Sequence, residues 1–140
     1  MKELSATLKE FIEKQELLRL AYLSGGGHPR VVPVWYVIVN DECYVGTGAM
    51  SAKLHAVERD ARVGWVIDGG EKPGYKGASF YGVAEDVTDS GVRAAVYRKL
   101  GEKYFGSENH PKFVEIYGAV DDAATVYWRL KAEDVFAWEY

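Results

Sequence analysis

The stretch that most limits how this chain can fold is residues 30–39, Arg-Val-Val-Pro-Val-Trp-Tyr-Val-Ile-Val, which is apolar at almost every position. A strand with one face in water alternates apolar and polar side chains, so this run predicts a strand covered on both faces. Pro33 lies in its middle. Because proline has no N–H to donate to a neighbouring strand, it indicates an edge, a bulge or an opening in the sheet.

The segment that follows this run is rich in small residues. Residues 44–53 read Tyr-Val-Gly-Thr-Gly-Ala-Met-Ser-Ala-Lys, which predicts a strand, a loop and the start of a helix. Backbone N–H groups, the hydroxyl groups of Thr47 and Ser51, and the ammonium group of Lys53 are the donors that an anion site uses. The plain alternative is a core strand followed by a solvated helix, and the spacing of these three side chains favours the site.

The remaining segments favour a mainly β fold. Short apolar segments bounded by turn residues predict six strands, over 18–24, 30–39, 43–47, 62–68, 78–87 and 125–131. Apolar residues at helical spacing predict helices over 5–15, 51–60 and 92–105, with a further helical turn over 113–117. Since most strands are joined by short turns, we expect an antiparallel β-barrel with peripheral helices.

Length and composition narrow the class of protein. A chain of 140 residues predicts a single domain over 1–140. The net charge of -4 is unlike the basic surface of a nucleic-acid-binding protein, so we expect no nucleic-acid partner. Ten Tyr and four Trp predict a ring-lined pocket or a large interface.

Cysteine and histidine usage predicts no metal site. Cys43 is the single cysteine, so no internal disulfide and no multi-cysteine metal site can form, and a reducing cytoplasm is expected. The three histidines match no ligand spacing, and no catalytic triad or carboxylate pair is evident. This favours chemistry supplied by a cofactor. No apolar run could span a bilayer and no signal-peptide core is present, so we expect no membrane partner.

In their order and spacing, five motifs together resemble the pyridoxamine 5′-phosphate oxidase-like family of FMN-binding split-barrel proteins. The motifs are Arg-Val-Val-Pro-Val-Trp at 30–35, Gly-Thr-Gly-x-x-Ser-x-Lys at 46–53, Arg-Asp-Ala-Arg-Val-Gly-Trp-Val at 59–66, Tyr-Gly-Val-Ala-Glu-Asp-Val at 81–87 and Trp-Arg-Leu-Lys-Ala-Glu-Asp-Val at 128–135. The resemblance covers nearly the whole chain and implies a six-stranded antiparallel split β-barrel.

The resemblance also implies a homodimer that binds FMN in clefts between two barrels and acts on a small-molecule substrate. Carried over by motif, Arg30, Ser51 and Lys53 hold the flavin phosphate, and Thr47 forms a hydrogen bond near the ring. The backbone of residues 31–33, which are Val31, Val32 and Pro33, faces the ring system. A phosphate group needs fixed donors and positive charge, which these residues offer.

The chain departs from the family pattern at three places. Ala52 replaces a second basic residue before the lysine, and Ala56 replaces an asparagine that many members have. The vitamin-processing oxidases have an Arg-x-His pair near the C-terminus for the substrate phosphate, but no histidine follows Trp128 here. We therefore expect flavin chemistry on a substrate other than pyridoxamine phosphate. A deazaflavin or haem cofactor, a flavin- or haem-binding module without turnover, and a purely structural dimer stay open as alternatives.

Overall fold

The computed structural model describes residue 1 and residues 3–140. Its core element is one seven-stranded sheet, in the order β2-β1-β5-β6-β7-β4-β3, in which every neighbouring pair is antiparallel. No helix in the described part of the chain is long and apolar enough to cross a membrane. In chain order the elements are α1 (Ala6–Glu13), β1 (Leu18–Leu23), β2 (Pro29–Val34), β3 (Val37–Val39), β4 (Glu42–Gly48), α2 (Ala52–Arg59), β5 (Arg62–Gly69), β6 (Lys76–Asp86), α3 (Ser90–Phe105), α4 (Pro111–Tyr117) and β7 (Thr125–Glu139).

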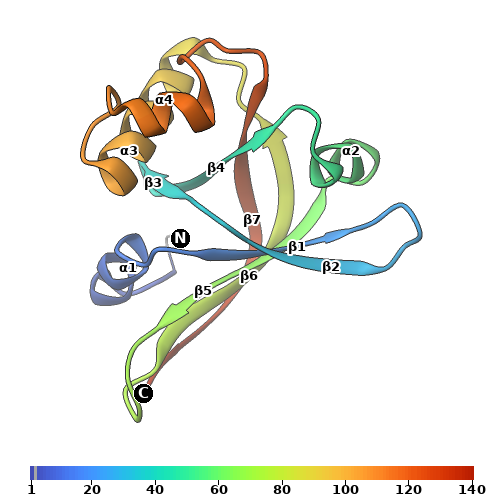
Figure 1. Ribbon diagram of the computed structural model, residues 1–140. Helices are drawn as coiled ribbons and strands as arrows, with labels where there is room; N and C mark the ends of the chain where they lie inside the picture. Colours follow the sequence, from blue (N-terminus) through green and yellow to red (C-terminus); the bar gives the residue numbers. More distant parts are fainter. Residues whose placement is uncertain (2) are drawn as a thin grey trace.

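The long strand β7 curls the sheet into a half-barrel (Figure 1). It pairs with β6 from Trp128 to Glu139, but with β4 only from Thr125 to Leu130. A bulge interrupts its pairing with β6 beside Gly82, where a Cβ atom would collide with the carbonyl oxygen of Lys131. The bulge increases the local twist, so β4 and the second half of β7 diverge. This architecture confirms the predicted split-barrel fold.

The prediction of six strands is wrong by one, because the apolar run breaks into β2 and β3 at Trp35 and Tyr36. Side chains of α3 form hydrogen bonds with the backbone of Tyr36 at the break. Its N–H donates to the hydroxyl of Tyr104 at 3.1 Å, and its carbonyl accepts from the ammonium of Lys103 at 3.1 Å. One turn earlier on α3, Lys99 donates to the carbonyl of Ile38 at 2.9 Å. These backbone groups are therefore hydrogen-bonded without pairing with another strand.

The two halves of the broken run differ in burial. Val37 and Ile38 of β3 are buried, as predicted for a strand covered on both faces. Val31 of β2 has 64% of its surface exposed, so one face of β2 is uncovered in a single chain. The predicted strand over 125–131 also continues further than expected, to Glu139, because its tail pairs along β6.

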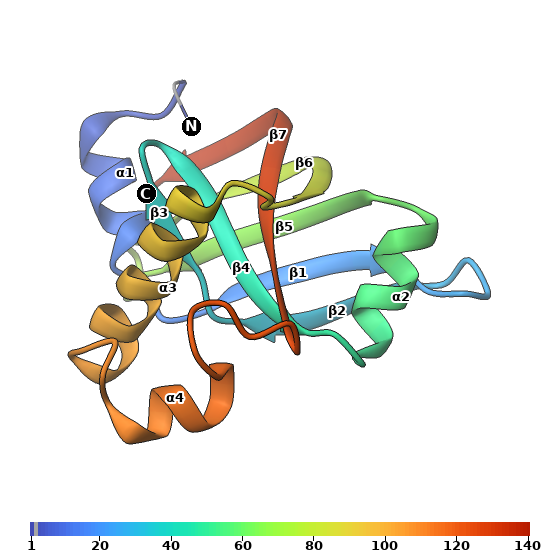
Figure 2. The same cartoon turned by 90° about the horizontal axis from the view of Figure 1, so that it is seen from above.

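The helices begin where the sequence supplies caps, and they divide the core in two. The hydroxyl groups of Ser5 and Ser51 accept from backbone N–H groups at the starts of α1 and α2, and the Asp89 carboxylate does so for α3. The larger apolar cluster lies beneath α1 and α2, and the smaller one beneath α3 and α4. Figures 1 and 2 both show the end of β4 between α4 and α2. The helices α4 and α2 therefore flank the end of β4 on either side.

Candidate functional site

The loop between β4 and α2 is held by its own hydroxyl groups. The Oγ atoms of Thr47 and Ser51 lie 3.0 Å apart, and Ser51 also accepts from the N–H of Leu54 at 3.2 Å. Thr47 is buried and Ser51 is half-buried. These short-range contacts place Lys53 in the first turn of α2, as the motif predicts. Three of the predicted site residues, Thr47, Ser51 and Lys53, are therefore brought together by the local fold.

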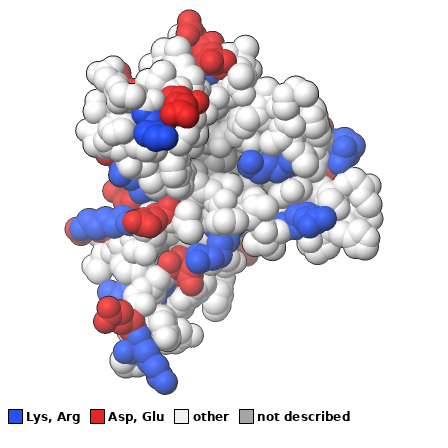
Figure 3. All heavy atoms as spheres, in the orientation of Figure 1, with Lys and Arg blue, Asp and Glu red and all other residues white. Residues whose placement is uncertain are grey.

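A cleft of about 320 Å³ lies beside this loop. Figure 3 shows the surface hollowed between the lobe formed by α3 and α4 and the part of the molecule built on α2. Two of the last three residues of β4, Gly46 and Gly48, have no side chain, and this leaves room for the cleft. A Cβ atom at Gly46 would lie 2.7 Å from Cε1 of Tyr117, so the tyrosine ring packs on bare backbone. The residues that line the cleft include Gly46, Thr47, Gly48, Lys53, Tyr117 and Asp122.

Lys53 brings an uncompensated positive charge to this cleft. Its side chain is half-buried, and this burial lowers the pKa of the ammonium group because desolvation disfavours the charged form. Within the described residues it makes no ion pair and no hydrogen bond to an acceptor. An anionic ligand would relieve this cost by pairing with the ammonium group.

The unpaired cations of the chain concentrate near Lys53. In the part of the chain that the structure describes, most basic side chains either pair with a carboxylate or donate to backbone carbonyls. Arg30, Lys53 and Arg59 do neither, and they lie on β2 and α2. Two further unpaired cations, Lys72 and Lys76, lie at the distant β5–β6 turn. Lys and Arg side chains accordingly gather over α2 and the β1–β2 hairpin in Figure 3.

The register of the sheet turns Arg30 toward α2. Arg30 lies opposite Tyr22 and Val32 lies opposite Leu20, and directly opposed residues share a face of the sheet. Leu20 is fully buried in the cluster that also contains Leu54 of α2. The Arg30 side chain therefore shares the α2-covered face with the Lys53 helix. No hydrogen bond joins Arg30 to the Thr47–Lys53 loop among the described residues.

The free edge of β2 offers very few hydrogen-bond donors. The N–H of Ser24 donates to the carbonyl of His28 at 2.9 Å, which fixes the alternation of bonded and non-bonded pairs along the β1–β2 hairpin. By this alternation Arg30 and Val32 bond to β1, whereas Pro29, Val31 and Pro33 point their backbone outward. Proline has no N–H, so Val31 supplies the single outward donor, flanked by three outward carbonyl groups.

Three residues near the site were not found by the sequence analysis. The guanidinium of Arg59 lies over the hairpin turn, 3.1 Å from where a Cβ atom of Gly25 would lie. Tyr117 and Asp122 line the cleft from α4 and the segment that follows it. The three glycines of the turn were a signal for Arg59, because they leave room above the hairpin. No local signal marks Tyr117 or Asp122, since both reach the cleft only through the packing of α4 on β4.

With this geometry, the motifs can be compared with known proteins. A model of the pyridoxamine 5'-phosphate oxidase family matches residues 4–139. The chain belongs to this family. The resemblance found in the sequence is thereby confirmed over nearly the whole length. Among curated proteins, none matches this chain.

Solved structures share the fold of this oxidase-family chain. A conserved hypothetical protein from Mycobacterium tuberculosis, Rv2991, superposes with a TM-score of 0.83 at 26% identity, covering 97% of this chain and 84% of that one. An FAD-binding protein from Mesorhizobium loti gives 0.74 at 23% identity, covering 98% and 96%. An F420 reductase gives 0.72 at 19% identity, covering 95% and 98%. Flavin and deazaflavin proteins therefore occur among the proteins with this fold.

Proposed function

We propose that the protein binds FMN and acts as a homodimeric, flavin-dependent oxidoreductase on a small molecule. The observation that carries this proposal is the location of Arg30, Lys53 and Arg59, all without a carboxylate partner in the described chain, on the side of the sheet covered by α2. A flavin phosphate is a dianion that needs such charges. We infer a cytoplasmic location, in which the buried thiol of Cys43 stays reduced.

Each group of the proposed site has a defined task. Arg30 and Lys53 would hold the phosphate, with Arg59 beside them at the hairpin turn. Ser51 can donate its hydroxyl proton to a phosphate oxygen when Thr47 donates to Ser51. The outward N–H and carbonyl groups of β2 match the mixed acceptors and donor on the edge of a flavin ring. The flavin, when bound, supplies hydride transfer, and the chain supplies binding and orientation.

A second copy of the chain would cover the outer face of the sheet. Register places Val31, Gly64 and Tyr81 in one row across this face, with Phe136 and Trp138 further along β7. Val31, Tyr81 and Phe136 have 64%, 57% and 69% of their surfaces exposed. Exposed apolar side chains gathered on one face of a sheet indicate an interaction surface. A partner docked here would cover the face of β2 that a single chain leaves open.

The test is a titration of the purified protein with FMN, followed by visible absorption. We expect saturable binding that weakens at least tenfold in Lys53→Ala and in Arg30→Ala, because each removes a phosphate contact worth roughly 1.5–3 kcal/mol. Lys72→Ala is the matched control, since it removes an unpaired lysine at the far β5–β6 turn. Unchanged FMN binding in both site variants would overturn the site.

Parallel titrations separate the alternatives. Binding of coenzyme F420 without FMN would assign a deazaflavin reductase, and a Soret band with haemin would assign a haem-binding module. If FMN binds, reduction by NADPH and turnover of a substrate would distinguish an enzyme from a flavin-storage module. Absence of binding to all three cofactors would reject the proposal.

A further inference from the structure

A lysine of α3, Lys103, is half-buried at the wall of a cavity separate from the cleft beside Lys53. Its Nζ atom lies 3.6 Å from the ring centroid of Tyr36 and donates to the backbone carbonyl of the same residue at 3.1 Å. Tyr36 is fully buried, so these two contacts fix the position of the amine. The cavity has a volume of about 210 Å³, and its lining residues are Glu13 from α1, Val37 and Ile38 from β3, and Lys99, Glu102 and Lys103 from α3.

The groups around the Lys103 ammonium place it beside this cavity. The charges that act on it belong to Cys43, to Glu13 and Glu16 at the end of α1, and to Lys99 one turn earlier on α3. Glu13 and Lys99 also line the cavity. The carbonyl that accepts from Nζ precedes Val37, and α3 lies alongside β3 (Figure 2). The amine is therefore held where the cavity meets the break between β2 and β3.

Burial makes this amine more easily deprotonated than an exposed lysine. Desolvation lowers the pKa of Lys103 to about 8, and Lys99 adds to the lowering, whereas Cys43, Glu13 and Glu16 oppose it. No carboxylate in the described part of the chain forms an ion pair with Lys103. At pH 7 a group with a pKa of 8 is about 10% unprotonated, compared with about 0.04% for an ordinary lysine. The unprotonated amine has the lone pair that a nucleophile needs, and it can still donate one N–H to Tyr36.

We propose that Lys103 is a covalent modification site, at which Nζ forms a Schiff base with a small, neutral aldehyde. The Nζ–C bond forms as the carbonyl double bond opens, and the two amine hydrogens then leave with the carbonyl oxygen as water. The step exchanges no electrons with a third reactant, so the free amine is sufficient. The buried side chains of Val37 and Ile38 offer apolar contact to the rest of the aldehyde.

The charge of the cavity sets the class of aldehyde. Two carboxylates, those of Glu13 and Glu102, line it together with one other ammonium group, that of Lys99. Lys99 already donates to the carbonyl of Ile38 at 2.9 Å. The cavity therefore has no surplus of positive charge for an anionic aldehyde, and a neutral one enters without repulsion.

The test treats the full-length protein with benzaldehyde and cyanoborohydride, which reduces the imine to a stable secondary amine, and maps the labelled lysines by mass spectrometry. At pH 7 we expect Lys103 to be labelled at least about tenfold faster than the exposed Lys112 and Lys131. The ratio of the Lys103 rate to the Lys131 rate should fall between pH 8 and pH 10, where ordinary lysines begin to lose their protons. With the anion 4-formylbenzoate this ratio at pH 7 should be smaller than with benzaldehyde.

Two variants of the same cavity provide the matched comparison. Lys103→Arg keeps a positive charge and a donor beside Tyr36 but has no nucleophilic amine, so the protein should lose its fast-labelled site. Lys99→Arg makes the same change one turn earlier on α3 and should keep it. Equal labelling rates of Lys103 and Lys131 in wild type would overturn the proposal, as would a larger ratio with 4-formylbenzoate. The wild-type rates depend on no variant and on no flavin, so this result is separate from the test of the proposed function.

Discussion

The two ends of the β4–β7 ladder contain two cavities of opposite character. At the end formed by Gly46, Gly48 and Thr125, the cleft of about 320 Å³ has the unpaired ammonium group of Lys53. At the end formed by Cys43 and Leu130, where β4 and β7 diverge, a larger cavity of about 460 Å³ is lined by apolar rings and carboxylates. The cavity with the greater volume is therefore not the one that has groups available to a phosphate-bearing cofactor.

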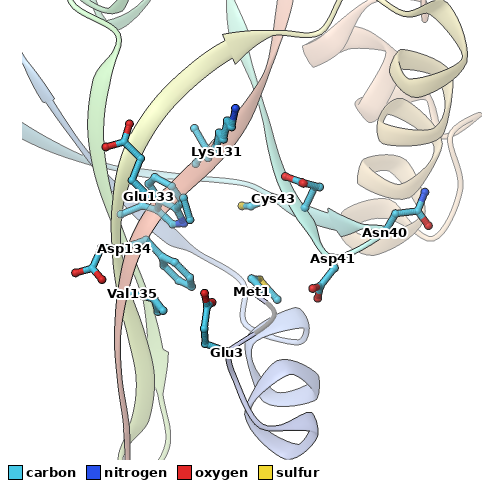
Figure 4. Close-up of a pocket in the computed structure, with 14 residues that line it drawn as sticks. Met1, Glu3, Asn40, Asp41, Cys43, Lys131, Glu133, Asp134 and Val135 are labelled. Carbon is cyan, nitrogen blue, oxygen red and sulfur yellow. The ribbon is translucent and has the colours of Figure 1, made fainter.

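Among the described residues, those that line the larger cavity include several carboxylates and Lys131, which is paired with Glu85, but no unpaired lysine or arginine. Figure 4 shows the carboxylates of Glu133 and Asp134 pointing away from its centre, and Asp41 pairs with Lys9 at 3.3 Å. Its floor is the stacked pair Trp65 and Phe80, whose ring centroids lie 5.2 Å apart. The comparison teaches that unengaged donors, and not volume, indicate where a ligand binds in this fold. A ligand site is defined by a few placed polar groups within apolar walls.

Reversing the charge of Lys53 should have the largest effect on the difference between the two cavities. Lys53→Glu replaces the free ammonium with a carboxylate, and we expect FMN affinity to fall about 100-fold, because an attraction to phosphate becomes a repulsion. Glu133→Lys makes the opposite change at the larger cavity and should leave FMN affinity within twofold. Titrations monitored by visible absorption would measure both. Equal losses in the two variants would mean that overall charge, and not the local site, controls binding.

Removing the Arg93 side chain, which supports the cleft wall, should have the next largest effect, a loss of stability. The guanidinium of Arg93 donates to the carbonyls of Val120, Asp122 and Thr125, and it lies 4.6 Å from the ring centroid of Tyr127. Arg93→Met should lower the free energy of unfolding by about 2–3 kcal/mol, because three backbone carbonyls, two of them part-buried, lose their hydrogen-bond donor. Urea denaturation would measure this.

The matched cation near the larger cavity is Lys131, which lies 3.8 Å from Glu85 and is exposed. Lys131→Met should change the free energy of unfolding by less than about 0.5 kcal/mol, as expected for a solvated ion pair. A loss in Lys131→Met as large as that in Arg93→Met would contradict the assignment of Arg93 as the support of the cleft wall.

A smaller, pH-dependent difference separates two side chains on the same strand. Burial raises the pKa of the Cys43 thiol to about 12, well above that of an exposed thiol, whereas Thr47 has no titrating group. The raised pKa contributes stability below pH 9 that is lost as the pH rises toward 12, because the unfolded thiol ionises first. Between pH 8 and pH 10, wild type should lose about 1.4 kcal/mol more than Cys43→Val.

Denaturation curves at both pH values would test this prediction, and taking the difference between the two proteins removes the common titration of the tyrosines and lysines. Thr47→Val serves as the control, because it changes a buried polar residue of the same strand without changing the pH dependence. Parallel pH profiles for wild type and Cys43→Val would show that the thiol is not buried as described.

Sequence alone identified the family and the curled antiparallel sheet, because their signals are local motifs in a fixed order. The Thr47–Ser51–Lys53 loop was predictable for the same reason, since its contacts join residues a few positions apart. The break at Tyr36 was not predictable, because it depends on Tyr104, which is 68 positions away. Tyr117 was missed for a similar reason, as its place in the cleft depends on α4 packing against Gly46.

The two edge strands of the open sheet are each closed to further pairing, by different means. On β2, the prolines at positions 29 and 33 remove two of the three outward N–H groups. Ammonium groups from α3 bind the carbonyls of Ile38 on β3 and of Tyr36 just before it. Sheets with open edges are templates for aggregation and amyloid growth unless such devices block them. These devices therefore disfavour edge-to-edge assembly of the half-barrel into fibres.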